Sequence, residues 1–149
     1  MTAADEDLEL WCAARTFLPV QSHPVRWLDW ERDFELAVGM DSTVTRESWL
    51  SNRAKGFEFC AVVEGERALA RAAVWTYSDT CWEVAAVRTR EECRRRGMAK
   101  SVVSFVTAHV LAAGRVPTLH TSSTNIAMLR AAKAVGFQLI DAEFEARSR

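Results

Sequence analysis

The amino-acid sequence predicts a mixed α/β fold, in which an antiparallel meander of strands is followed by a parallel crossover. Three observations lead to this prediction. Apolar segments separated by turn residues fill 58–88, as strands joined by tight turns do. The apolar period then changes to three or four residues over 97–113, which is typical of a helix. Beyond that helix, short segments of strand type and helix type alternate, as they do around a parallel connection.

The first part of the chain is expected to be mainly helical. Apolar residues recur at helical spacing in 5–17, which predicts a short amphipathic helix. A second helix is expected around 27–34, after two prolines, with three aromatic side chains on one face. A polar turn follows at 41–45, and the apolar pair at 49–50 predicts one more helical turn.

The middle of the chain predicts three consecutive strands. The first covers 58–64 and ends at the turn residue Gly65. The second covers 67–77, and a polar turn at 78–80 separates it from the third, at 82–88. The interior of the third strand is apolar on both faces, so we expect it to be covered on both sides.

The last part of the chain predicts a helix, a strand, a helix and a strand. The long helix covers 97–113 and ends at a glycine. Pro117 precedes a short strand at 118–121, and a second helix follows at 125–135 with a serine or threonine cap. The alternation of apolar and polar residues over 137–146 predicts a half-exposed final strand.

Composition excludes several classes of protein. A length of 149 residues matches one domain of 1–149, which is large enough to fold without disulfides. With 19 basic and 20 acidic side chains, the chain lacks the basic excess of a nucleic-acid-binding protein. No apolar run is long enough to span a membrane, and the acidic first ten residues do not resemble a signal peptide. The four cysteines show neither paired nor metal-ligand spacing, so we expect reduced thiols, no metal and a cytoplasmic location.

The junction between the third strand and the long helix, 88–100, is the segment most informative about function. The first amide groups of a helix have no partner within it, and the helix dipole makes its start attractive to anions. Gly97 allows close approach of the backbone, Ala99 keeps the first turn small, and three arginines at 94–96 add positive charge. This pattern favours pyrophosphate binding. Neither GxxxxGK(S/T) nor GxGxxG occurs, so an ordinary solvated basic loop stays open as the alternative.

The pattern Arg94-x-x-Gly97-x-Ala99 resembles the signature of the GNAT superfamily, the acyl-CoA-dependent N-acetyltransferases. The order of predicted elements over 59–140 is similar to theirs, and Gly114 to Pro117 approximates the RGxxP turn of some members. The resemblance implies a GNAT-like, mostly antiparallel sheet with helices on both faces. It implies acetyl-CoA as co-substrate, bound by a core at 57–146, and an acceptor-side helical region at 1–55.

The resemblance also implies which residues hold the cofactor. The third predicted strand would pair its backbone with the pantetheine arm, as an added strand does. The amides at the start of the long helix would bind the pyrophosphate, and an asparagine of the later helix would contact the cofactor arm. The residues assigned in this way are Val87, Arg88, Thr89, Arg94, Arg95, Arg96, Gly97, Met98, Ala99, Lys100, Ser101 and Asn125.

Glu83 is the candidate general base. It precedes Arg94 by a spacing similar to that of the catalytic glutamate in the histone-acetylating branch. A primary amine is mostly protonated at neutral pH, so a group must accept its proton before or during attack on the thioester. A purely structural cross-strand role for Glu83 stays open, and His120 is the alternative base. Many GNAT enzymes carry a tyrosine acid where this chain has Ala132, and Tyr77, the only tyrosine, lies on a different strand.

We therefore expect transfer of acetyl from acetyl-CoA to a primary amine by direct attack in a ternary complex. Tryptophans at 27, 30 and 49 either fill the core or point to an apolar small-molecule acceptor, and a protein amine stays open. Because of Ala132, a non-catalytic CoA-binding module is the rival, and another phosphate ligand is a third possibility. Only about 12 residues follow Phe137, where the family has two strands, so one strand is expected to be absent or supplied by a partner in a homodimer.

Overall fold

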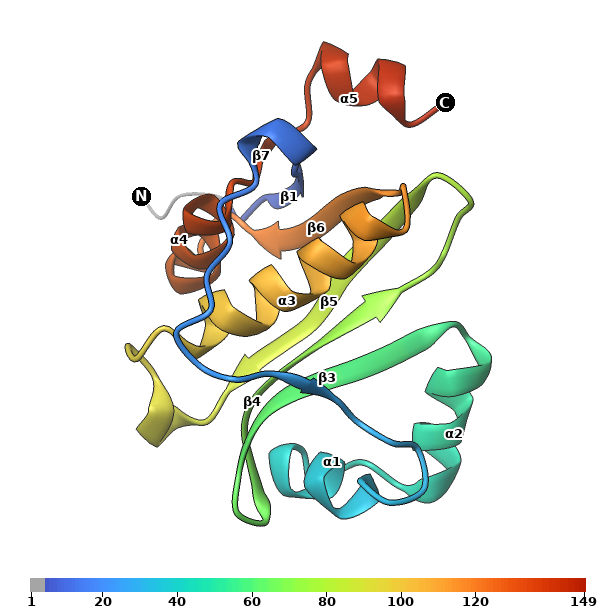
Figure 1. Ribbon diagram of the computed structural model, residues 1–149, viewed down its shortest axis with the longest axis vertical. Coiled ribbons are helices and arrows are strands. Elements are labelled where there is room, and N and C mark those ends of the chain that lie inside the picture. Colours follow the sequence, from blue (N-terminus) through green and yellow to red (C-terminus); the bar gives the residue numbers. More distant parts are fainter. Residues whose placement is uncertain (1–4) are drawn as a thin grey trace.

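The computed structural model describes residues 5–149 as one seven-stranded sheet with helices on both faces (Figure 1). The strands are β1 (Asp7–Trp11), β2 (Arg26–Trp27), β3 (Phe57–Glu64), β4 (Arg67–Trp75), β5 (Cys81–Thr89), β6 (Val116–Ser122) and β7 (Gln138–Leu139). The α-helices are α1 (Phe34–Met40), α2 (Arg46–Ala54), α3 (Met98–Ala112), α4 (Ile126–Val135) and α5 (Ala142–Arg147). Single 3-10 turns lie at Ala14–Thr16 and Glu91–Cys93.

The strand order is β2-β3-β4-β5-β6-β1-β7. All neighbouring strands are antiparallel except β5 and β6, which run parallel because α3 connects them as a crossover. This arrangement confirms the predicted mixed, mostly antiparallel sheet. The sequence placed six elements correctly, with ends shifted by a few residues: the strands β3, β4, β5 and β6 and the helices α3 and α4.

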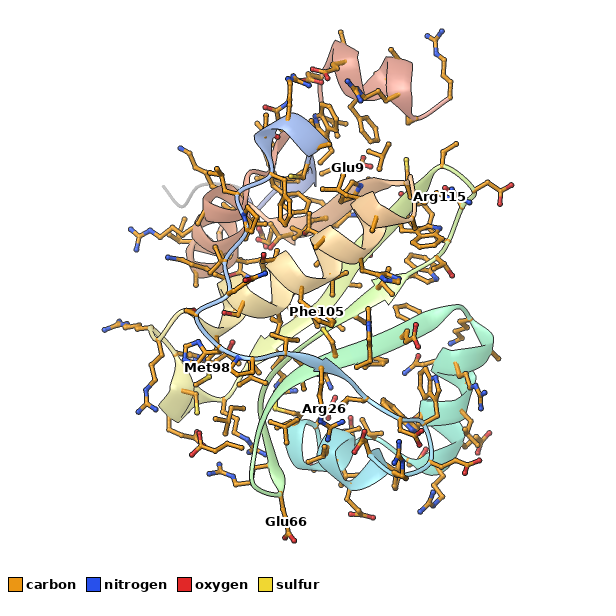
Figure 2. All side chains as sticks on the ribbon, viewed as in Figure 1. Glu9, Arg26, Glu66, Met98, Phe105 and Arg115 are labelled. Carbon is orange, nitrogen blue, oxygen red and sulfur yellow. The ribbon has the colours of Figure 1, made fainter. Side chains whose placement is uncertain are left out.

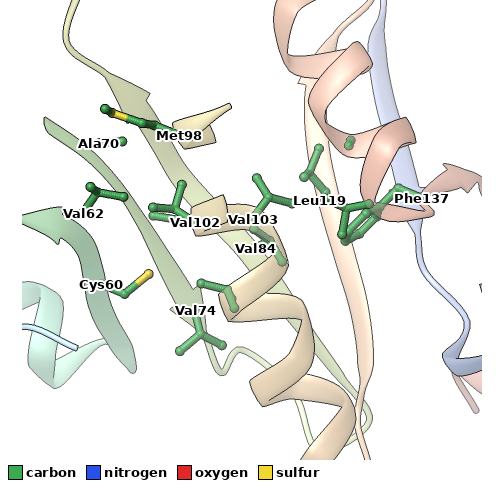
Figure 3. Close-up of a cluster of buried hydrophobic side chains, with 14 of the residues drawn as sticks. Cys60, Val62, Ala70, Val74, Val84, Met98, Val102, Val103, Leu119 and Phe137 are labelled. Carbon is green, nitrogen blue, oxygen red and sulfur yellow. The ribbon is translucent and has the colours of Figure 1, made fainter. Parts of the chain in front are cut away.

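Alternate residues of the strands face two separate apolar clusters. On one face, Val102, Val103 and Val106 of α3 are fully buried against strand residues such as Val74 and Val84 (Figure 3). On the other face, α1 and α2 cover the opposite side of β3 and β4, in a cluster that includes Met40, Trp49, Phe59 and Ala73. The period of two along each strand therefore divides the core between the helical layers.

The predicted helix at 5–17 is wrong, because the segment forms β1. Leu10 packs in the α3-side cluster, whereas Trp11 packs on the opposite face against Phe144. An apolar spacing that fits a helix also fits a strand whose two faces are both covered, so the pattern was ambiguous. β1 lies between β6 and β7 and pairs antiparallel with both. After Phe137 the chain forms one strand, β7, as expected, and β1 of the same chain lies between β7 and β6.

The predicted helix around 27–34 is wrong in its first half. Trp27 lies in β2, where it pairs with Cys60 of β3. The Asp29 carboxylate accepts hydrogen bonds from the amides of Glu31 and Arg32, which forms a turn before α1 begins. Residues 1–55 are therefore not a wholly helical region, since two strands of the sheet come from its described part.

The predicted final strand at 137–146 is correct only for two residues. Gln138 and Leu139 pair with β1. Asp141 then accepts a hydrogen bond from the amide of Phe144 and caps α5, which ends the strand. The α5 side chain of Phe144 packs on Trp11, with ring centroids 5.8 Å apart.

Candidate functional site

The strands β5 and β6 pair only at one end and enclose a cavity beyond it. Their parallel pairing covers Cys81–Glu83 and Val116–Thr118, although both strands continue further. The cavity has a volume of about 260 Å³. Its lining comes from the free edge of β5, from β6 and from the start of α4: Glu83, Val84, Ala85, Ala86, Val87, Leu119, His120, Thr121, Asn125 and Met128. A backbone edge without a paired strand is available to an extended ligand.

A β-bulge marks the cavity edge of β5. Ala86 and Val87 together oppose Ala72 of β4, where the register shifts between Arg71 and Ala73. Ala86 adopts φ 54°, which is an unfavourable backbone conformation for a residue with a side chain. Such strain concentrates at functional sites, because a bulge redirects the backbone toward a ligand.

The loop before α3 presents a run of unpaired amides. Arg95 and Gly97 adopt left-handed conformations, with φ 67° and φ 81°. In the part of the chain that the structure describes, none of the amide groups from Arg95 to Lys100 donates to a protein acceptor. Amides without a partner at the start of a 15-residue helix are suited to an anion, which is the feature that a pyrophosphate site needs. Met98 marks this end of α3 in Figure 2.

The residues expected to hold the cofactor divide into three groups. Val87 lines the cavity, and Asn125 lines it while its Oδ1 accepts a hydrogen bond from the amide of Met128. The arginines and Lys100 surround the unpaired amides with exposed side chains. Arg88 and Thr89 do not reach the β5–β6 cavity. They line a second cavity of about 220 Å³ beside Met40, because β5 bends at the bulge.

The expected role of Ser101 needs correction. Its side chain is buried, and its hydroxyl donates to the carbonyl of Gly97 and accepts from the amide of His23. The hydroxyl of Ser22 lies 3.0 Å from it as well. Ser101 therefore holds the N-terminal segment across the start of α3 and is not free to bind a ligand.

The structure brings together the two residues that the sequence named as alternative bases. Nδ1 of His120 is hydrogen-bonded to the carboxylate of Glu83, which is 15% exposed. Nε2 of His120 lies 3.7 Å from Oε1 of Glu9, its register partner on β1. Glu9 was missed because its segment was read as a helix. A histidine between two carboxylates can move a proton from the cavity to the surface.

Tyr77 belongs to the same polar cluster. It follows β4, and its hydroxyl lies 3.1 Å from Oγ1 of Thr118, the register partner of Glu83 on β6. Burial is the main cause that raises the pKa of Tyr77, and the nearby Glu83 and Glu9 raise it further. Ala132, at the position where the resemblance places a tyrosine acid, is fully buried in the core and offers no proton.

Trp27, Trp30 and Trp49 pack in or against the apolar clusters of the core and line neither cavity. Trp49 is 3% exposed, and its ring centroid lies 4.4 Å from that of Trp30. Trp27 packs against Phe105 and His109 of α3. These residues therefore give no support to the expected apolar acceptor pocket. The aromatic rings near the cluster of Glu83 and His120 are instead those of Trp75 and Tyr77, with centroids 5.1 Å apart.

Comparison with known families agrees with this geometry. The family model described as FR47-like protein matches residues 62–146, which include β4, β5, the unpaired amides and the cavity. No curated protein sequence matches the chain. Within residues 5–149, no helix is long and apolar enough to cross a membrane.

Solved structures of GNAT proteins share the fold. One, described as a GNAT-family acetyltransferase from Novosphingobium aromaticivorans, is 25% identical with a TM-score of 0.67, over 92% of this chain and 60% of that one. A GNAT-family acetyltransferase from Colwellia psychrerythraea is 15% identical with a TM-score of 0.74, over 92% and 54%. The aminoglycoside N-acetyltransferase AAC(6')-Iy, solved with CoA, is 16% identical with a TM-score of 0.63, over 77% and 91%. The present chain thus spans little more than half the length of the first two.

Proposed function

Since the chain belongs to the FR47-like family, within the GNAT acetyltransferase superfamily, we propose that it transfers the acetyl group of acetyl-CoA to a primary amine. One observation carries this proposal. The hydrogen-bonded pair of Glu83 and His120 opens on the same cavity that the bulged edge of β5 lines. A proton acceptor thus faces the place where an extended acyl donor would lie.

Acetyl-CoA fits the groups that the chain presents. The unpaired amides from Arg95 to Lys100 suit its pyrophosphate, and the exposed arginines at 94–96 add favourable charge. The free edge of β5 at 84–87 can pair with the amides of the pantetheine arm. That one of the similar structures was solved with CoA supports the same placement.

The chemistry follows from this arrangement. Glu83 accepts a proton from the bound ammonium, directly or through one water, and His120 passes it toward solvent and Glu9. The neutral amine attacks the thioester carbonyl, whose oxygen accepts a hydrogen bond from a backbone amide at the bulge. The new C–N bond forms, the C–S bond breaks, and the nitrogen gives up its second proton to water. The leaving thiolate takes a proton from water, because Ala132 supplies none.

A non-catalytic CoA-binding module is the second candidate, and the buried Ala132 favours it, since no acid stands at that position. A protein amine as acceptor is a variant of the first candidate. A non-catalytic module would release no CoA. Transfer to a protein amine would release CoA and acetylate a protein in place of a small molecule.

A thiol-release assay tests the proposal. Purified protein is mixed with acetyl-CoA and a panel of small primary amines and lysine-containing peptides, and products are weighed by mass spectrometry. We expect release of CoA that depends on an amine, with one acetylated amine formed for each CoA. Binding of acetyl-CoA without release for any amine would favour the module. Release without an acetylated product would mean hydrolysis and contradict the proposal.

A further inference from the structure

We propose that the acceptor is an amine that carries a carboxylate close to its amino group, as amino acids do, and that Arg71 binds this carboxylate. The inference rests on the proposed function and names the substrate class of the same site. The distribution of charge along β5 favours this acceptor. The negative charge of Glu83 lies where the cavity begins, and the positive charges of Arg71 and Arg88 lie at the bulge.

Arg71 lies on the acceptor side of the sheet, opposite the face covered by α3. It is the register partner of Ala61 on β3 and of Arg88 on β5. Its guanidinium lies 5.8 Å from the ring centre of Phe59, in the cluster beneath α1 and α2. Nε of Arg71 donates to the carbonyl of Ala86 at 3.3 Å. Because Ala86 lines the cavity, the guanidinium stands beside the place proposed for the thioester.

The guanidinium of Arg71 is only partly satisfied by the protein. Within residues 5–149, no carboxylate oxygen lies within 4 Å of it, and the Ala86 carbonyl is its one hydrogen-bond acceptor. Burial lowers the pKa of Arg71, the nearby Asp41 raises it, and Arg88 lowers it. The two terminal nitrogens therefore keep their donors for a ligand. Their planar fork matches the two oxygens of a carboxylate.

The charge around Arg71 matches a ligand with one negative charge. Nη1 of Arg88 lies 3.9 Å from Oδ2 of Asp41, and Asp41 also accepts hydrogen bonds from Thr43. The guanidinium groups of Arg71 and Arg88 and the carboxylate of Asp41 together carry a single net positive charge at the bulge. A carboxylate would balance it.

The opposite end of the groove suits an ammonium group. Glu83, His120 and Glu9 gather there, three positions before Ala86 on β5, which is roughly 10 Å along a strand. An amino group placed over the intervening Ala85 would lie within reach of Glu83 directly or through one water. Its carboxylate would then meet the guanidinium of Arg71.

The same charges disfavour a polycationic acceptor. An aminoglycoside, the substrate class named for one similar structure, would bring further positive charges against Arg71 and Arg88. Phe57 stacks on Trp75, and the ring of Tyr77 packs against Trp75. The rings of Trp75 and Tyr77 offer an apolar surface for an acceptor side chain.

Matched pairs of ligands test this inference. The probes are the free amino acids and their amides, because each pair shares the amino group and side chain and differs in the carboxylate. Binding to CoA-saturated protein is measured by calorimetry, and turnover by thiol release. We expect at least one amino acid to bind at least tenfold more tightly than its amide. No binding of any free amino acid, or equal or tighter binding of the amides, would overturn the inference.

Variants of two arginines on β4 complete the test. Arg71→Gln should bring the ratio of acid to amide affinity close to one, and Arg71→Lys, which keeps the charge but not the fork, should give an intermediate ratio. Arg67→Gln is the matched control, since Arg67 pairs with Glu92 on the exposed surface. Its ratio should stay unchanged. An unchanged ratio in both Arg71 variants would overturn the inference.

The outcomes separate this inference from the function on which it rests. Acetylation of amines regardless of a carboxylate would overturn the inference and leave the proposed function intact. A carboxylate preference in binding, lost in Arg71→Gln and without acetylation of any probe, would contradict the proposed function and support the site at Arg71.

Discussion

The imidazole of His120 is hydrogen-bonded to the carboxylate of Glu83, across the two strands at the point where they separate. The residues are 37 positions apart in the sequence, and the parallel pairing of β5 with β6 brings them together. Glu83 is 15% exposed and His120 is 41% exposed, so the pair runs from the interior of the cavity to its mouth. A proton taken inside the cavity therefore has a path to solvent.

Glu83→Gln should lower kcat by about 100-fold or more, which is the usual contribution of a general base. The affinity for acetyl-CoA should stay within a factor of about two, because Glu83 does not belong to the unpaired amides before α3. Steady-state kinetics and a binding titration measure the two quantities. Glu58→Gln, on the exposed start of β3, is the control. Unchanged turnover in Glu83→Gln would remove this residue from the mechanism.

His120→Asn should lower kcat less than Glu83→Gln does. The variant removes the group that passes the proton to solvent, but Glu83, the first proton acceptor, stays in place. The double variant should be no slower than Glu83→Gln alone, because residues that act as a unit give non-additive effects. Single-turnover rates of the three variants give the comparison. Multiplicative losses would show that the two side chains act independently.

Gly136→Ala should destabilise the protein strongly. Gly136 adopts φ 109° after α4, and an added Cβ would overlap the backbone carbonyl of Thr16. In the same N-terminal segment, the amide of Leu18 donates a hydrogen bond to the carbonyl of Val135. The clash would therefore also disturb the segment that follows β1. We expect a loss of about 2–4 kcal/mol in the free energy of unfolding.

Gly114→Ala is the matched control for that variant. Gly114 also adopts a left-handed conformation, with φ 74°, but nothing lies within 4 Å of an added Cβ. Its loss should be about 1 kcal/mol, from backbone strain alone. Urea unfolding of both variants measures the difference, and equal losses would show that the contact with Thr16 does not matter.

Alkaline pH should destabilise the fold through two buried thiols. Burial raises the pKa of Cys12 to about 11 and that of Cys60 to about 12, from a usual 9.0. Their contribution is fully present below pH 9. Above pH 9 the unfolded chain loses these protons while the folded chain keeps them, so the free energy of unfolding falls as pH rises toward 11.

Each thiol should contribute a slope that rises from about 0.7 kcal/mol per pH unit at pH 9 toward a limit of about 1.4 kcal/mol per pH unit. Urea unfolding at pH 8, 9 and 10 measures the slope. Cys60→Ala should make it shallower, whatever the variant costs in overall stability at pH 8. A slope identical to that of the native protein would contradict the account.

The central sheet and the loop of unpaired amides before α3 could be predicted from the sequence because their signals are local. Turn residues separate the three strands of the meander, and a glycine ends each of the two main helices. The pattern from Arg94 to Ala99 needs only a helix start to become an anion site. The structure adds the left-handed conformation of Arg95, which exposes more of the loop amides than the pattern implies.

The N-terminal strand could not be predicted, since its signal depends on distant partners. Leu10 and Trp11 are both buried, on opposite faces, because β1 lies inside the sheet with α3 and α4 on one side and α5 on the other. Such a short apolar segment fits either a helix or a strand. Because of this error Glu9 was missed. It joins the cluster of Glu83 and His120 only through its pairing with His120.

The residues near the proposed acceptor site were missed for a similar reason. Arg71 is one of many arginines in the sequence, and only the bulge at Ala86 brings its guanidinium to the carbonyl of Ala86. Trp27, Trp30 and Trp49 suggested an acceptor pocket because they are large and apolar, but such residues usually belong to the core. No local pattern distinguishes Trp75 and Tyr77, which do lie beside the cluster of Glu83 and His120, from the others.

A calorimetric titration with acetyl-CoA tests the central claim most directly, performed on the native protein and on two glycine variants. Gly97→Val strains the left-handed turn and brings a Cβ within 3.2 Å of Oγ of Ser22, whereas Gly65→Val strains an open hairpin turn with nothing within 4 Å of the added Cβ. We predict saturable binding, on the order of micromolar, for the native protein and Gly65→Val, and its loss in Gly97→Val. No binding by the native protein, or equal binding by Gly97→Val, would contradict the assignment of the loop before α3 as the acetyl-CoA site.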